Sequence, residues 1–169
     1  MCGGIRFTYD AALEPQLIAI YPAERLAQFR TAGLIETTFW QPRPVLPLLL
    51  DGALALLDWG DREGKLSLPK TGWARQESLD AGKWDALRPQ PVTIPARQGV
   101  EKGVWFGIDR GLAGVVVERR GERRVYMLTV PPTDDYRRLT GHDRMPLLLD
   151  QAEVVPLAPP AAPQQTPLF

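Results

Sequence analysis

Residues 45–59, VLPLLLDGALALLDW, contain two apolar runs joined by Asp51-Gly52. This dipeptide is a strong short-range signal for a β-hairpin. Residues 112–130, LAGVVVERRGERRVYMLTV, repeat the arrangement, with β-branched runs on either side of a charged turn at Gly121. Two such hairpins predict a sheet that is mainly antiparallel.

Short helices are predicted around these hairpins. Residues 22–33, PAERLAQFRTAG, have the pattern of an amphipathic helix that ends at Gly33, and residues 77–87, ESLDAGKWDAL, predict a short helix. The 17 prolines favour short strands and irregular connections over long helices. We therefore predict an α+β fold with a mainly antiparallel, curled or barrel-like β-sheet and a few short helices.

The chain of 169 residues is long enough for one domain with a buried core, which we assign to residues 1–156. The remaining residues, LAPPAAPQQTPLF, are rich in proline and alanine and carry no charge. Such a stretch buries too little surface to order itself, so we predict a flexible tail over residues 157–169.

Composition excludes several kinds of site. Hydrophobic residues make up 44% and charged residues 24%, and 20 basic residues balance 20 acidic ones, so bulk charge favours no particular partner. A single cysteine excludes an intramolecular disulfide, and with a single histidine we expect neither a metal site nor a cofactor. The sequence lacks an apolar run of about 18 residues and a secretory signal pattern, so we expect a cytoplasmic monomer without membrane contact.

The only cysteine, Cys2, directly follows the first methionine. If Met1 is removed, Cys2 carries a free α-amine and a thiol on one carbon, and about 10–20% of such an amine is neutral at pH 7. A 1,2-aminothiol condenses with an aldehyde and then closes a thiazolidine ring. The same pair is also suited to acyl transfer by an N-terminal nucleophile. Cys2 as an inert, buried small residue is the third interpretation.

Two further residues are candidates only in combination with Cys2. His142, in GHDRMP, is the single histidine and follows a glycine among charged residues, which is typical of a loop at a sheet edge. Glu101, in IPARQGVE, precedes an aromatic strand. Taken alone, a lone histidine is more often structural than catalytic, and such a glutamate is usually solvated.

Together these segments resemble the SOS response-associated peptidase (SRAP) family, whose members protect abasic sites in single-stranded DNA. The resemblance covers residues 1–150, and HDRMP is its most specific motif. The segments that carry it, in order, are MCGG at the start, DWG with Trp59 and Gly60, WARQES with Arg75 and Glu77, IPARQGVE with Glu101, and GHDRMP with His142.

The resemblance implies a mechanism. The protein removes its own Met1 as a peptidase, the amine of Cys2 attacks the aldehyde of an abasic site to form a Schiff base, and the thiol closes a stable thiazolidine crosslink. It implies that Glu101 acts as an acid/base beside this amine, that His142 moves a proton to and from the sugar oxygen, that Arg75 holds a phosphate, and that Trp59 helps to wall the site.

The chain also departs from the family pattern. Trp73 stands where the family has asparagine, Gly4 where it has arginine, and Arg97 where it has an acidic residue. We expect Arg97, Arg6 or Arg43 to restore positive charge, and Trp73 to stack on a base. These changes leave two alternatives: a non-catalytic module of the same fold that binds single-stranded DNA, or an N-terminal-nucleophile amidohydrolase or peptidase.

The final residues, QTPLF, match Gln-x-x-Leu-Phe, the short peptide by which bacterial repair proteins bind the DNA sliding clamp. Leu168 and Phe169 would be its apolar anchors, and Gln165 would make a polar contact. We therefore expect the sliding clamp as a partner and association with the nucleoid. An adaptor in which only the tail matters is the remaining alternative.

Overall fold

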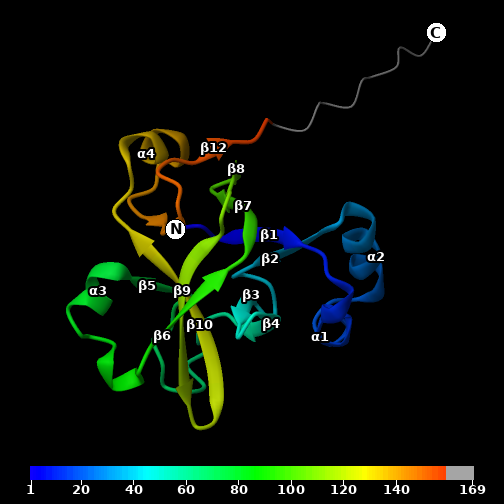
Figure 1. Cartoon of the computed structure of the whole chain (residues 1–169), viewed down its shortest axis with the longest axis horizontal. Helices are drawn as coiled ribbons and strands as arrows, with labels where there is room; N and C mark the ends of the chain where they lie inside the picture. The colour runs from blue at the N-terminus through cyan, green and yellow to red at the C-terminus, as the bar shows by residue number, and fades with distance from the viewer. Residues whose placement is uncertain (159–169) are drawn as a thin grey trace.

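Two β-sheets and four short α-helices make up residues 1–158, which this computed structural model describes (Figure 1). The first sheet has five strands in the order β12-β8-β7-β1-β2: Val155–Pro156, Val104–Gly107, Ala96–Glu101, Gly4–Thr8 and Leu34–Thr38. The second has seven, in the order β11-β10-β9-β6-β3-β4 with β5 beside β10: Met145–Pro146, Glu122–Val130, Leu112–Arg119, Gln90–Ile94, Val45–Leu50, Ala53–Asp58 and Trp73–Arg75.

Strand pairing confirms the predicted fold class. Neighbouring strands are antiparallel except for β5, which runs parallel to β10. The fold is α+β and mainly antiparallel, and within residues 1–158 neither sheet closes into a barrel.

Both predicted hairpins are confirmed. Strands β3 and β4 are joined by Asp51 and Gly52 at φ of 49° and 78°, and β9 and β10 by Arg120 and Gly121 at φ of 54° and 78°. Positive φ at both central residues is the type I′ geometry, whose twist matches that of the flanking strands.

A third hairpin of this geometry, between β7 and β8, was not predicted. Lys102 and Gly103 have φ of 47° and 80°, and Glu101 pairs with Val104 across the turn. The turn therefore ends β7 at Glu101 and fixes the position of that carboxylate.

The helices agree with the sequence in part. Helix α2 (Ala23–Ala32) ends as predicted at Gly33, whose φ of 67° is the left-handed conformation that closes a helix. Over residues 77–87 only α3 (Gln76–Asp80) and a 3₁₀ turn (Asp85–Leu87) form, because Gly82 takes a φ of 72° between them. Helices α1 (Glu14–Ile18) and α4 (Asp134–Thr140) complete the set.

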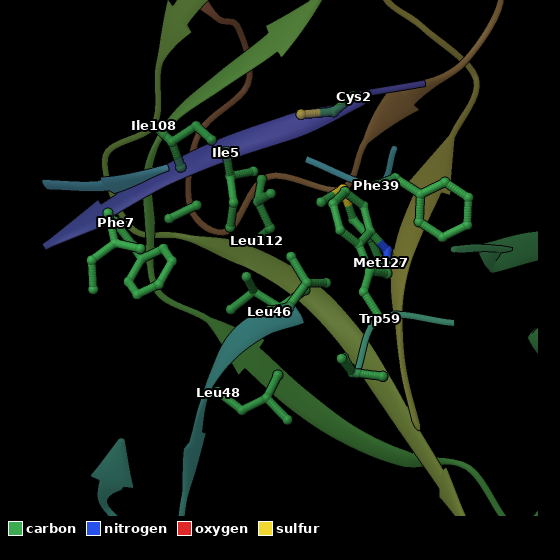
Figure 2. Packing of buried hydrophobic residues seen from close by; sticks show 14 of the residues in the cluster. Cys2, Ile5, Phe7, Phe39, Leu46, Leu48, Trp59, Ile108, Leu112 and Met127 are labelled. Atoms are coloured by element: carbon green, nitrogen blue, oxygen red, sulfur yellow. The ribbon is translucent and has the colours of Figure 1, made fainter. Parts of the chain in front are cut away.

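Side chains from both sheets meet in one hydrophobic cluster (Figure 2). Ile5 and Phe7 of β1 belong to it together with Leu46 of β3 and Met127 of β10. Cys2, on the segment that leads into β1, is a fully buried member of this cluster. In the described part of the chain, no helix has the length and apolar character needed to cross a membrane.

Candidate active site

A cavity of about 510 Å³ opens beside the first residues of the chain. Four other segments form its walls: the turn after β2, the start of β5, the β7–β8 turn and the loop after α4. The lining residues are Met1, Gly3, Thr38, Trp40, Trp73, Val100, Glu101, Lys102, Gly103 and His142. Residues from five distant parts of the sequence are thus brought to one place, and two of them are the predicted Glu101 and His142.

The terminal amine lies in an ion pair inside this cavity. The Met1 nitrogen is 2.7 Å from Oε2 of Glu101, whose side chain is only 8% exposed. Burial lowers the pKa of the Met1 amine below its ordinary value of 8.0, although the hydrogen bond and the charge of Glu101 oppose that shift. Oε2 accepts no other hydrogen bond in the described structure, so the terminal amine is its one polar partner there.

The Cys2 thiol points away from solvent. Its Sγ donates a hydrogen bond to the Gly4 carbonyl oxygen at 3.1 Å, and burial raises the pKa of the thiol to about 12. A glycine on β7 makes room for the sulfur: a Cβ at Gly99 would lie 3.1 Å from Sγ and 2.6 Å from the Phe106 ring. The thiol is therefore held protonated next to the amine-bearing end of the chain.

Trp73 holds the Cys2 backbone. Its indole Nε1–H donates to the Cys2 carbonyl oxygen at 3.1 Å, and the side chain is 8% exposed. The ring packs against Phe39 and Trp59, with centroid distances of 4.6 and 5.6 Å. Trp73 also lines the cavity, so its stacking on a base stays a prediction.

Trp59 lies in the core next to Trp73. It is 1% exposed, and its Nε1–H donates to the Gly72 carbonyl oxygen at 2.7 Å. It does not line the cavity, but its ring packs against Trp73, which does. Trp59 therefore supports the wall of the cavity from within the core.

His142 has a hydrogen-bond partner for either protonation state. It follows Gly141, where α4 ends, and its Nδ1 accepts a hydrogen bond from the Arg144 backbone N–H at 3.1 Å, which leaves the proton of a neutral ring on Nε2. The Asp143 carboxylate lies 3.1 Å from the same Nδ1 and would accept its proton if the ring were charged. A partner in both states suits a residue that moves a proton.

Arg144 anchors the loop that carries His142. Its guanidinium makes two hydrogen bonds to the Glu77 carboxylate, at 2.7 and 2.8 Å, and a third to the Thr129 carbonyl oxygen at 2.7 Å. Through these bonds Arg144 and Glu77 tie α3 to the loop that carries His142.

The predicted arginines lie outside the cavity. Arg75 and Arg97 are exposed, and neither lines it. Arg6 is occupied, because it donates to Glu36 and Gln98 and its guanidinium lies 3.7 Å from the centroid of the Trp105 ring.

Gly4 brings no cationic side chain to this end of the chain. A Cβ at Gly4 would lie 3.0 Å from both the Thr37 carbonyl oxygen and Thr38 Cγ2, so β1 fits closely against β2. The clamp-binding residues Gln165, Leu168 and Phe169 lie outside the described residues, and within residues 1–158 no cluster of three or more His, Cys, Asp or Glu side chains could hold a metal.

Sequence analysis missed three features of the site. The buried position of Gly99 and the hydrogen bond from Trp73 depend on contacts across the fold and leave no local signal. The Lys102-Gly103 turn had a weak signal, since Gly103 lies between two strand-like segments, but Lys102 is not one of the residues that favour positive φ. Comparison of the chain with protein-family models, with curated proteins and with solved structures finds no match.

Proposed function

We propose that this chain is an SRAP-like protein that captures abasic sites in single-stranded DNA covalently, through Cys2, after Met1 has been removed. The observation that supports this proposal most directly is the 2.7 Å pair between the terminal amine and the buried Glu101 carboxylate, in a cavity that His142 also lines. An amine, a carboxylate, an imidazole and a thiol one residue from the terminus are the groups that thiazolidine formation uses.

The proposed reaction begins at the amine. Once Met1 is gone, Glu101 accepts a proton from the Cys2 ammonium, and the neutral amine adds to the C1′ aldehyde of the ring-opened sugar. Before this addition, His142 donates a proton to the sugar ring oxygen as the ring opens and takes up the proton that the C1′ hydroxyl loses, which leaves the aldehyde. Loss of one water then gives a Schiff base between the Cys2 nitrogen and C1′.

The thiol completes the crosslink. The Cys2 sulfur adds to the Schiff-base carbon and its proton passes to the nitrogen, which closes the five-membered ring, so that one water is released in the whole reaction. A thiol with a pKa of about 12 is ionised to roughly one part in 10⁵ at pH 7, whereas about 10–20% of an ordinary terminal amine is neutral at that pH. The amine therefore acts first and the thiol second.

Trp73 takes a positioning role in this proposal. Because its N–H fixes the Cys2 carbonyl oxygen, the Cys2 backbone keeps a defined position beside the cavity that Trp73 lines. This hydrogen bond stands at the position where the SRAP pattern has asparagine, so loss of the asparagine does not leave the Cys2 end unsupported.

Intact-mass spectrometry tests the reaction. The protein is incubated with a single-stranded oligonucleotide that contains one abasic site. We expect a heat-stable species with the mass of the chain without Met1, plus the oligonucleotide, minus one water. Cys2→Ser is the matched control: it keeps the terminal amine but lacks the thiol, so its Schiff base hydrolyses unless it is reduced with borohydride.

Two alternatives make different predictions in the same experiment. A non-catalytic module binds the oligonucleotide without gaining mass. An amidohydrolase turns over an amide substrate and forms no DNA adduct. The tail residues Gln165, Leu168 and Phe169 extend the proposal to a sliding-clamp partner, in the cytoplasm and at the nucleoid.

A further inference from the structure

One solvent-exposed aromatic side chain, that of Trp40, lines the cavity. All five tryptophans lie within residues 1–158, and Trp40 is the exposed one, with 71% of its surface in contact with solvent. It lines the cavity that holds the terminal amine. Its Nε1 is the atom nearest to a Cβ built at Gly3, at 3.7 Å, so the indole lies over the backbone next to Cys2.

The turn that carries Trp40 is fixed on both sides. The guanidinium of Arg62 donates to the carbonyl oxygens of Phe39 and Gln41, at 2.7 and 3.3 Å. The Gln41 side chain accepts from the Thr38 backbone N–H at 3.1 Å and donates to Arg43 O at 2.8 Å.

The Phe39 ring meets the Trp40 indole edge-on, with centroids 5.2 Å apart. The exposure of Trp40 is therefore built into a rigid turn and is not the result of a loose loop. A side chain held in place before its ligand arrives loses little entropy on binding.

Charge around the cavity is sparse. Lys102 is the one lysine or arginine among the lining residues of the described structure, and its Nζ already donates to the Gly141 carbonyl oxygen at 3.1 Å. Arg6 and Arg144 are paired with Glu36 and Glu77. Phosphate contacts at this place can thus supply only a small part of the affinity for a nucleic acid.

We propose that Trp40 is a stacking platform for a nucleobase of single-stranded DNA, next to the nucleotide that reacts at Cys2. This inference rests on the proposed function and names how its substrate is held. A planar, exposed indole offers a base a contact that is independent of sequence, and single strands present unstacked bases for such contacts. Duplex DNA does not, because its bases are already stacked on one another.

Fluorescence anisotropy with an undamaged, labelled single-stranded oligonucleotide tests the platform without any covalent chemistry. Trp40→Ala and Trp40→Leu should each raise Kd by roughly 5- to 150-fold, as expected for loss of one base–aromatic stack. Trp40→Phe should retain most of the affinity because it keeps an aromatic face. Ile18→Ala, at another exposed apolar side chain (63% exposed), is the matched control and should bind like the unmodified protein.

Three results would overturn the inference: no measurable binding by the unmodified protein, equal binding by Trp40→Leu and Trp40→Phe, or an unchanged crosslinking rate in Trp40→Ala. Failure of the proposed chemistry looks different. In that case no adduct forms with abasic DNA, or with a small aldehyde that needs no platform, while the Trp40 variants still bind undamaged strands more weakly.

Discussion

At the scale of single residues, the Met1 amine and Glu101 define how the site titrates. Burial, which disfavours the charged amine, outweighs the attraction of the carboxylate, and the pKa of the amine falls below 8.0. The neutral, nucleophilic form is therefore reached at a lower pH than for a solvated terminus, and it becomes scarce only as the pH falls below the lowered value.

This balance can be measured on protein that retains Met1. Competitive acetylation of the terminal amine, followed by mass spectrometry over a series of pH values, should give a midpoint below 8.0. Glu101→Gln removes the carboxylate that raises the pKa while burial remains, so its midpoint should lie lower still. A midpoint at or above 8.0 in the unmodified protein, or an upward shift in Glu101→Gln, would show that burial does not dominate.

A substitution at Trp73 can separate the effect of its hydrogen bond from the effect of its packing. Trp73→Phe keeps an aromatic ring but removes the N–H that holds Cys2, which should slow crosslinking to abasic DNA by about 3- to 10-fold, the equivalent of one net hydrogen bond. The rate is measured by gel shift under single-turnover conditions.

The matched control is Trp59→Phe, which loses an indole hydrogen bond to Gly72 O behind the site. It should lower the free energy of unfolding by about 1 kcal/mol, as Trp73→Phe does, and leave the crosslinking rate unchanged. Equal rates for the two variants would contradict a positioning role for Trp73.

At the scale of elements, β7 does two things for the site: it ends at Glu101, and it leaves space for the Cys2 sulfur at Gly99. Gly99→Ala should lower the free energy of unfolding by about 1–3 kcal/mol, since its Cβ meets both Phe106 and Sγ in a packed core. Urea unfolding measures the change.

Gly107→Ala, on the neighbouring strand β8, is the control for Gly99→Ala. Its Cβ would meet no atom closer than 3.8 Å, so we expect a change within about 0.5 kcal/mol. If Gly99→Ala unfolds at the same urea concentration as Gly107→Ala, the sulfur does not need the space that β7 provides.

At the scale of the whole molecule, the proposed function assigns the crosslinking reaction to the domain, residues 1–156, and binding of the sliding clamp to the tail, residues 157–169. Deletion of residues 165–169 should abolish binding to an immobilised bacterial sliding clamp and leave the crosslinking rate unchanged. The double variant Leu168→Ala, Phe169→Ala should behave in the same way, because these are the proposed anchors. Unchanged clamp binding in either variant would remove the clamp from the proposal.

The sequence predicted the turns and helix ends that depend only on the residues at those positions. The hairpins at Asp51-Gly52 and Gly121 and the end of α2 at Gly33 follow from residues that tolerate positive φ, and all three are confirmed. We expected Cys2, Glu101 and His142 to act at one site only because of the family resemblance, since no local pattern links residues so far apart. The burial of Trp73 and the exposure of Trp40 could not be predicted, because both depend on how β5 and the turn after β2 pack in the finished fold.

The strands that pair with β1 determine when the N-terminus becomes enclosed during synthesis of the protein. β1 pairs with β2 and with β7, so the first residues of the chain are enclosed only after residue 101 has been synthesised. At about 5–20 residues per second, this takes roughly 5–20 s from the start of translation. During that interval the terminus is an open peptide end, and afterwards Met1 is held against Glu101. The proposed function therefore requires that Met1 leaves either before the fold closes or from within the closed site.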